Sequence, residues 1–254
     1  MNLINFEEPN YTEAMVRAFS DNVQPTLYEI QSYHGFSSTF NSRHFAAWDK
    51  RFSRLDLLEN DFQELEGISA KRGIWGFSML LDNKRKTLFL FTKEKNLESV
   101  RRKFGKDKLH YFHALLLKNR HLDTYVSPSE GDPFQFSLFD EGIERYNDRR
   151  RLEAIDIIGD DYDRFDQVVI LTLAEENGKA TKVEAGIFSS EFRLIQSVDL
   201  SDYIKPDFED ASVVGFNDAS NPGNKQIPNL KKEYTPKEKQ IVSTRKRNAE
   251  KDRG

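Results

Sequence analysis

The sequence has no cysteine among its 254 residues. This absence excludes a disulfide framework and every zinc site built on thiolates. Long apolar runs are also missing, since no stretch approaches the roughly 20 apolar residues that a membrane span needs. Residues 1–9 show no basic leader followed by an apolar run, so we predict no signal peptide. The expectation is a soluble, cytoplasmic protein that contacts no membrane.

Familiar catalytic motifs are missing as well. The chain has no Walker loop, no Gly-rich dinucleotide turn and no Gly-x-Ser-x-Gly elbow. The aspartates between Asp160 and Asp166 are spaced somewhat like a calcium loop, but the required glycine and the closing glutamate are absent. We therefore expect no cofactor and no metal site, and a binding protein rather than an enzyme.

Charge is abundant and unevenly distributed. Charged residues make up 31% of the chain, and the net charge is only −4. Residues 84–121 carry 12 basic and 3 acidic side chains, whereas residues 122–166 carry 5 basic and 13 acidic ones. Residues 224–254 are basic again, with 10 basic against 4 acidic side chains. This distribution is more informative than the mean, because it separates a basic middle, an acidic connection and a basic tail.

Apolar residues recur at spacings of three and four in the first part of the chain, as Met15, Val16 and Phe19 illustrate, which predicts helices. Later, Asn96 is expected to cap a helix that Gly105 interrupts. The helices predicted in this way comprise residues 10–22, 25–35, most of 36–66, a segment after Asn96, and 107–121.

Strands are predicted where β-branched and aromatic residues form short apolar runs. Residues 74–81 and 87–92 form a hairpin around a polar turn. The expected C-terminal strands are residues 152–158, 167–174, 181–188 and 192–198, with a hairpin turn at 175–179. The predicted fold class is α+β: a helical N-terminal part, a β-hairpin plus helix, a C-terminal antiparallel β-meander and a disordered tail.

The same patterns predict a domain organisation. Residues 1–123 form the helical and hairpin part, and residues 124–150 form an acidic connection. Residues 151–205 form the meander, packed on the same domain. Residues 206–254 contain four of the eight prolines and few apolar side chains, so we predict a flexible basic tail.

One short motif lies in the acidic connection. Gln135-Phe136-Ser137-Leu138-Phe139 resembles the Gln-Leu-Ser-Leu-Phe peptide by which many bacterial proteins bind the DNA-polymerase sliding clamp. The resemblance implies that Gln135 hydrogen-bonds in a polar subsite and that Leu138 and Phe139 fill an apolar pocket. Phe136 departs from the usual leucine. The alternative is that the four apolar side chains pack this connection onto the core.

Clustered lysine and arginine side chains are what phosphate contact requires. The alternative is a solvated surface that the acidic connection balances. The candidate nucleic-acid-binding residues are Lys84, Lys86, Lys93, Arg101, Arg102, Lys103, Lys106, Arg245, Lys246 and Arg247.

Three histidines, His110, His113 and His121, are predicted to share one side of a helix, which makes them candidates for acid–base catalysis. The competing interpretation is that they are helix-surface residues near a helix end. The hairpin with Asp82, Lys93 and Glu94 resembles restriction-type nuclease cores, but the spacing of its acidic and lysine residues does not match.

A second resemblance covers about residues 70–140. Arg72-Gly73-Ile74-Trp75, Lys93-Glu94-Lys95, His110-Tyr111 with Leu115 and Asn119, and the segment 135–139 are similar to an uncharacterised bacterial domain family that is associated with mobile elements and toxin loci. The resemblance implies a bacterial or phage origin and gives no activity.

Three functions remain open, and the third of them is a plain DNA-associated regulator for which deletion of residues 224–254 would be the damaging change. The first is a non-enzymatic protein that binds the sliding clamp and inhibits or modulates DNA replication, as a toxin with an antitoxin-like partner or as a phage inhibitor. The second is a nucleic-acid-binding or nuclease-like protein of a defence or toxin locus, which would contact DNA through the basic residues.

Overall fold

The structure is a computed structural model. It describes residues 10–35, 42–106, 108–125, 140–176 and 178–205, together with Leu3, Phe6 and Phe40. The clamp-like motif and the predicted tail lie outside the described residues.

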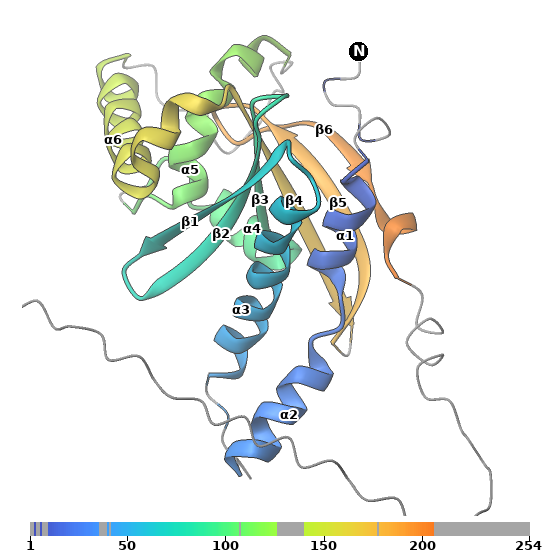
Figure 1. The fold of residues 1–254 in the computed structure, drawn as a ribbon. Coiled ribbons are helices and arrows are strands. Elements are labelled where there is room, and N and C mark those ends of the chain that lie inside the picture. The colour runs from blue at the N-terminus through green and yellow to red at the C-terminus, as the bar shows by residue number, and fades with distance from the viewer. Residues whose placement is uncertain are drawn as a thin grey trace, which may run out of the picture. The chain divides into compact units, whose positions relative to one another are not determined.

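A six-stranded mixed sheet forms the centre of the fold, with its strands in chain order (Figure 1). Its strands are β1 (Leu65–Arg72), β2 (Trp75–Asp82), β3 (Thr87–Lys93), β4 (Gln167–Glu176), β5 (Lys179–Phe188) and β6 (Leu194–Asp199). β3 and β4 run parallel, and all other neighbours are antiparallel. The parallel pair therefore joins an N-terminal and a C-terminal group of three strands.

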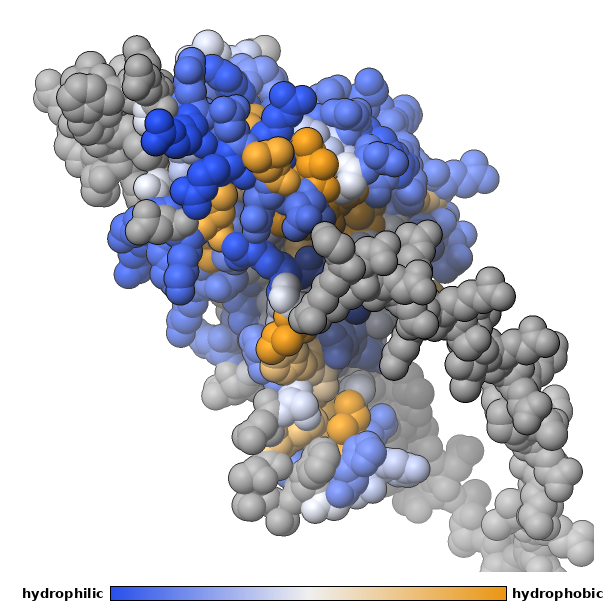
Figure 2. Space-filling model, turned by 90° about the vertical axis from the view of Figure 1, so that its left-hand side faces the viewer, coloured by the Kyte–Doolittle hydropathy of each residue, from blue (hydrophilic) through white to orange (hydrophobic). Residues whose placement is uncertain are grey.

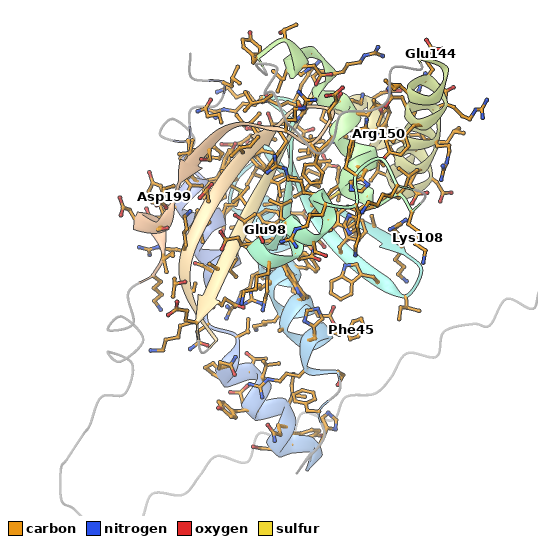
Figure 3. All side chains as sticks on the ribbon, turned by 180° about the vertical axis from the view of Figure 1, so that it is seen from behind. Phe45, Glu98, Lys108, Glu144, Arg150 and Asp199 are labelled. Carbon is orange, nitrogen blue, oxygen red and sulfur yellow. The ribbon has the colours of Figure 1, made fainter. Side chains whose placement is uncertain are left out.

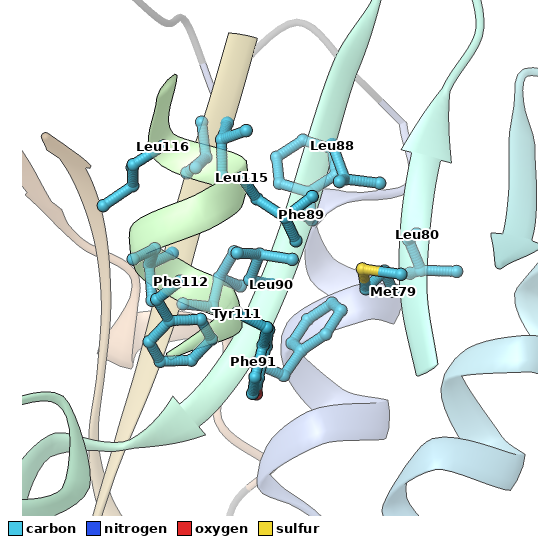
Figure 4. Close-up of a cluster of buried hydrophobic side chains, with 14 of the residues drawn as sticks. Met79, Leu80, Leu88, Phe89, Leu90, Phe91, Tyr111, Phe112, Leu115 and Leu116 are labelled. Carbon is cyan, nitrogen blue, oxygen red and sulfur yellow. The ribbon is translucent and has the colours of Figure 1, made fainter. Parts of the chain in front are cut away.

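The two central strands are buried on both faces, which explains their nearly continuous apolar sequences. In β3, Phe89 and Phe91 contact the aromatic rings of Tyr11 and Phe19 on one face. The residues between them point to the opposite face, because side chains alternate along a strand. Figure 4 shows the resulting core on both sides of β3.

One face of the sheet is covered by α1 (Thr12–Ser20) and α3 (Arg43–Asp56), which lie in front of it in Figure 1. α2 (Gln24–His34) connects them and ends at Gly35, whose φ of 65° closes the helix. α3 continues into a 3₁₀ turn, η1 (Leu57–Asn60). These helices confirm the predicted helical N-terminal part.

The other face is covered by the segments between β3 and β4, as the reverse view in Figure 3 shows. These are α4 (Glu94–Arg101), α5 (Tyr111–Leu115), the 3₁₀ helix η2 (Leu116–Tyr125), α6 (Asp140–Ile158) and η3 (Gly159–Arg164). A last 3₁₀ turn, η4 (Ser201–Tyr203), follows β6. The α+β class, the hairpin plus helix and the antiparallel C-terminal meander are thus confirmed.

We expected most of residues 36–66 to be helical and the helix to end at Gly67. The strand β1 corrects this expectation. The helix α3 covers only part of this range, and the chain already extends as a strand from Leu65. In β1, only Leu65, Ile68 and Ala70 are buried, because the strand lies at the edge of the sheet. β1 is therefore too polar to contain the apolar run from which strands were predicted.

The predicted strand at residues 152–158 is wrong, because these residues form the end of α6. Tyr146, Arg150, Ala154 and Ile158 are buried, and they are spaced by four residues along one side of the helix. Leu152 and Ile155, which made the segment resemble a strand, are exposed instead. The meander therefore has three strands rather than four.

The predicted helix 107–121 is also interrupted. Its α-helical part is only α5, and the rest is the 3₁₀ helix η2. Asn96 does not cap α4, which begins at Glu94. Instead, Asn96 Nδ2 donates a hydrogen bond to Thr92 Oγ1 over 2.8 Å. None of the helices in the described part of the chain combines the length and apolar character needed to cross a bilayer.

Seen from the side that carries the free ends of β1 and β2, the surface is mainly hydrophilic with small apolar patches (Figure 2). Ile74, between these two strands, is 93% exposed, and Leu152 of α6 is also exposed.

Candidate ligand-binding site

The sheet opens between β2 and β3, and a cavity occupies this opening. β2 and β3 pair only from Asp82 with Thr87 to Leu80 with Phe89. The first half of β2 pairs with β1 instead, as far as Trp75 with Arg72. The cavity beyond the last β2–β3 pair, called here the aromatic cavity, has a volume of about 300 Å³. It is lined by His44, Trp48, Phe52, Trp75, Phe91, Thr92, Lys93, Asn96, His110 and Tyr111.

One wall of the aromatic cavity comes from α3 and the start of β2. His44 and Trp48 are one helical turn apart, so they lie on the same side of α3. The ring of Trp75 stacks on that of His44 at 5.7 Å and meets the ring of Trp48 edge-on at 6.4 Å. Phe45, which projects from α3 in Figure 3, lies 5.3 Å from Trp75. Trp75 is only partly buried.

The facing wall comes from the start of α5. The Tyr111 ring stacks between Phe77 at 4.2 Å and His110 at 4.5 Å. His110 precedes the helix, and its Nδ1 accepts a hydrogen bond from the Phe112 N–H. Burial, together with the positive charge of the nearby Arg72 and the neighbouring His113, lowers the pKa of His110 to about 3. His110 is therefore a neutral ring, and its proton is on Nε2 because Nδ1 accepts a hydrogen bond.

Polar groups reach the aromatic cavity from the carboxyl end of β3 and from α4. The polar residues that line it there are Thr92, Lys93 and Asn96. Lys93 Nζ lies 2.5 Å from Glu175 Oε2 on β4. A cavity lined by aromatic residues on two sides and by a few polar residues at its edge is typical of sites for small organic ligands.

A second cavity of about 350 Å³, called here the cationic cavity, lies against the aromatic cavity, because both are lined by His44 and Lys93. Arg43 and Arg51 of α3 contribute to it, as does Glu175. Its other lining residues are Val23, Gln24, Leu27, Phe40 and Ala47.

Arg51 is held inside the fold with a side-chain exposure of 1%. Its Nη2 donates to Glu175 Oε1, and its Nε donates to the Phe19 carbonyl over 3.2 Å. Burial lowers the pKa of Arg51, while Glu175 opposes that shift. An arginine remains protonated in proteins at neutral pH, so Glu175 is its counter-charge.

Of the three histidines predicted as catalytic candidates, only His110 lines the aromatic cavity. The ring of His113 is 6.1 Å from that of His110 but is fully buried. His113 Nε2 donates to the Val100 carbonyl, and its Nδ1 accepts from the His110 N–H. His121 is exposed on η2, where its Nδ1 lies 3.1 Å from the Lys118 carbonyl oxygen. The three rings therefore do not form one site.

The predicted nucleic-acid-binding residues fall into separate groups. Lys84 and Lys86 flank the turn between β2 and β3, whereas Lys93 lies at the opposite end of β3. The remaining described candidates lie at or after the end of α4, where Arg101 Nε donates to the Phe192 carbonyl and Arg102 pairs with Glu98. Of the described candidates, Lys93 alone lines the aromatic cavity. Arg245, Lys246 and Arg247 lie outside the described residues, as do Gln135, Phe136, Ser137, Leu138 and Phe139.

The nuclease-like residues lie at opposite ends of the hairpin. Asp82 accepts hydrogen bonds from the Tyr11 hydroxyl at 2.5 Å and from the Lys84 and Arg85 N–H groups. Lys93 and Glu94 come six and seven residues after Thr87, the pairing partner of Asp82. At about 3.3 Å per residue, this separation is about 20 Å. These three side chains therefore do not meet at a common catalytic centre.

The described ranges contain no group of three or more His, Asp and Glu side chains that could hold a metal ion. The aspartates near residue 160 face separate basic partners. Asp161 pairs with Arg164 at 2.6 Å, and Asp163 lies 3.7 Å from Lys118.

Sequence reasoning missed the aromatic residues of the site. Trp48 was assigned to a helix core and Trp75 to a strand, in each case from periodicity alone. One signal was available, because the chain has only two tryptophans. Both line the same cavity and contact each other.

Fold and site together define an α+β protein with a six-stranded mixed sheet and an aromatic cavity where that sheet opens. The chain belongs to a family of unknown function, DUF5986, whose model matches residues 7–246. No curated protein and no solved structure matches the chain. The family match includes every residue that lines the two cavities.

Proposed function

We propose that this protein binds single-stranded nucleic acid and holds an unpaired base in the aromatic cavity. The single observation that carries the proposal is the opening between β2 and β3, where the rings of His44, Trp75 and His110 line a cavity edged by Lys93. Aromatic rings stack on bases of any sequence, and a lysine beside them attracts the phosphate backbone.

The volume of the aromatic cavity suits one base. Its 300 Å³ is at the lower end of the range for small-molecule sites. The polar groups at its edge match a base as well, because the Asn96 amide and His110 Nε2–H can hydrogen-bond to the edge of a ring. A base inside a duplex is stacked and paired, so the protein should prefer single strands.

Intrinsic fluorescence provides a direct test, since both tryptophans of the chain line the cavity. Titration with a short single-stranded oligonucleotide should quench this fluorescence, and a duplex of the same sequence should quench it less. In fluorescence anisotropy with a labelled strand, Trp75→Ala should weaken binding by about tenfold or more, as expected for the loss of one base stack.

Tyr33→Ala is the matched control, because Tyr33 is an exposed aromatic residue on α2 that lines neither cavity. It should bind like the parent. Equal affinity of the Trp75→Ala and parent proteins, or equal affinity for duplex and single strand, would contradict the proposal.

A second candidate function rests on the motif Gln135–Phe139, which joins two described elements, η2 and α6. According to this second candidate, the protein binds the bacterial sliding clamp and inhibits replication in the cytoplasm, as a toxin or a phage protein. A pulldown with purified clamp should lose the protein when Gln135, Leu138 and Phe139 are changed to alanine. Retention of that variant at the parent level would count against it.

The two candidates make opposite predictions for one pair of variants. Trp75→Ala should weaken nucleic-acid binding by about tenfold or more and leave clamp capture intact. Leu138→Ala with Phe139→Ala should do the reverse, because this pair of substitutions leaves the rings and charges of both cavities unchanged.

A further inference from the structure

The aromatic and cationic cavities share a boundary formed by two side chains, His44 and Lys93. When the ring of a ligand occupies the aromatic cavity, the group attached to that ring therefore points either to solvent or into the cationic cavity. The second cavity is large enough to hold a phosphate group, with about 350 Å³ of space.

The charges around the cationic cavity favour an anion. Arg43, Arg51 and Lys93 bring three positive charges, against one carboxylate from Glu175. His44 adds no charge near neutral pH, because burial lowers its pKa and the neighbouring Lys93 and Arg51 lower it further. The cavity thus carries a net charge of +2.

Arg43 is the group best placed to bind such an anion. Its Nη2 donates to Gln24 Oε1, a neutral acceptor, so this contact leaves the guanidinium charge uncompensated. Its guanidinium carbon lies 6.0 Å from the centre of the Tyr28 ring, which supports the side chain at the cavity. Arginine offers a planar fork of donors that fits two phosphate oxygens at once.

Glu175 determines which anion balances the cationic cavity, because its carboxylate reduces the net positive charge there. One of its oxygens accepts from the buried Arg51 and the other from Lys93. A phosphodiester carries one negative charge, whereas a terminal phosphate monoester carries up to two at neutral pH. The net charge of +2 is matched by the monoester and only half matched by the diester.

We propose that the cationic cavity is a subsite for a terminal phosphate, so that the protein recognises the phosphorylated end of a nucleic-acid strand rather than its interior. This inference rests on the proposed nucleic-acid binding. The terminal base would stack in the aromatic cavity, and its phosphate would be bound by Arg43 and Lys93.

The experiment compares four versions of one single-stranded oligonucleotide: 5′-phosphorylated, 3′-phosphorylated, phosphorylated at both ends, and with hydroxyl groups at both ends. An internal fluorophore leaves both ends free, and anisotropy gives the affinities. A preference on the order of tenfold for a strand with one particular phosphorylated end is expected, as for added charge-assisted hydrogen bonds.

Arg43→Gln should reduce this preference to about twofold or less. Lys50→Gln is the matched control, because it removes one positive charge from the same helix but lines neither cavity. It should keep the preference. Lys93→Gln is a second test variant, which keeps the experiment decisive if Arg43→Gln does not fold.

The outcomes separate this inference from the proposed function. Equal binding of all four strands would overturn the phosphate subsite and leave base binding in place. A preference that survives both Arg43→Gln and Lys93→Gln would also overturn the subsite. If no strand binds at all, the proposed function fails, and the inference fails with it.

Discussion

Lys93 Nζ lies 2.5 Å from Glu175 Oε2, and this contact joins the parallel strands β3 and β4 beside both cavities. Glu175 also accepts from Arg51, so one carboxylate bridges a partly exposed lysine and a buried arginine. Glu175 therefore contributes a negative charge to the cationic cavity and also balances the charge of Arg51 in the core.

Glu175→Gln should lower the free energy of unfolding by about 3–5 kcal/mol, because it leaves the buried Arg51 charge without a charged partner. Urea unfolding followed by circular dichroism measures the change. Glu98→Gln removes the exposed pair with Arg102 and should cost less than about 1 kcal/mol. Similar losses in the two variants would show that the Arg51 charge is not sealed from solvent.

Asn119→Leu should lower the free energy of unfolding by at least about 3 kcal/mol. Asn119 is fully buried, and its Nδ2 donates to the Val168 carbonyl at 2.9 Å and to the Phe188 carbonyl at 2.7 Å. Its Oδ1 accepts from the Val168 N–H at 2.7 Å. Leucine has a similar volume but leaves three buried backbone groups unpaired, each of which costs about 1–3 kcal/mol.

Asn60→Leu is the control for this change, since Asn60 is exposed and donates only to the Leu57 carbonyl. Asn60→Leu should leave the free energy of unfolding nearly unchanged when both variants are measured by thermal or urea unfolding. A neutral Asn119→Leu would mean that water or a shifted backbone replaces the three hydrogen bonds.

Gly186→Ala should destabilise the fold by about 1–3 kcal/mol through overpacking. A Cβ atom at this position of β5 would lie 2.6 Å from Cε2 of the buried Phe188. Gly76→Ala in β2 is the matched control, because no atom lies within 4 Å of the added Cβ. Combining Gly186→Ala with Phe188→Leu should recover part of the loss, and no recovery would argue against this clash.

Stability should fall as the pH drops below about 6.5. Burial lowers the pKa of His110 to about 3 and that of His113 to about 4 in the folded chain. An unfolded histidine has a pKa near 6.5, so between that value and the folded values the unfolded chain binds more protons. The stabilising effect of the two neutral rings is full above pH 6.5 and is lost as the pH falls towards the folded values.

Between pH 7 and pH 5.5 this linkage amounts to about 2 kcal/mol for the two histidines together. Urea unfolding at several pH values in this range measures it. His113→Gln, whose amide does not titrate, should show about half the slope. Stability that is constant or rises towards pH 5.5 would contradict the prediction.

The elements predicted correctly are those whose pattern is local. Continuous apolar sequences identified β2 and β3, and Gly35 marked the end of α2, because the core and the backbone impose these residues directly. β1 was missed because an edge strand needs few apolar residues, and α6 was misread at its end because Leu152 and Ile155 are exposed.

The site was predicted only in part. Lys93 and His110 were candidates on sequence grounds, and both line the aromatic cavity. Their aromatic partners could not be assigned, because the cavity depends on where β2 and β3 stop pairing and on which helix covers the gap. The parallel pairing of β3 with β4, which brings Glu175 to Lys93, joins segments far apart in the sequence and leaves no local signal.

The short pairing between β2 and β3 makes the first half of β2, together with β1, a two-stranded arm that is attached to the rest of the sheet only at its base. Trp75 lies at the far end of this arm, whereas Lys93 belongs to β3, which is paired with β4 along its whole length. A small bend of the arm would change the distance between the stacking ring and the ammonium group without breaking a β2–β3 hydrogen bond. In the base-binding function proposed above, this bend would fit the site to purines and pyrimidines, whose rings differ in size, while its charged side stays fixed.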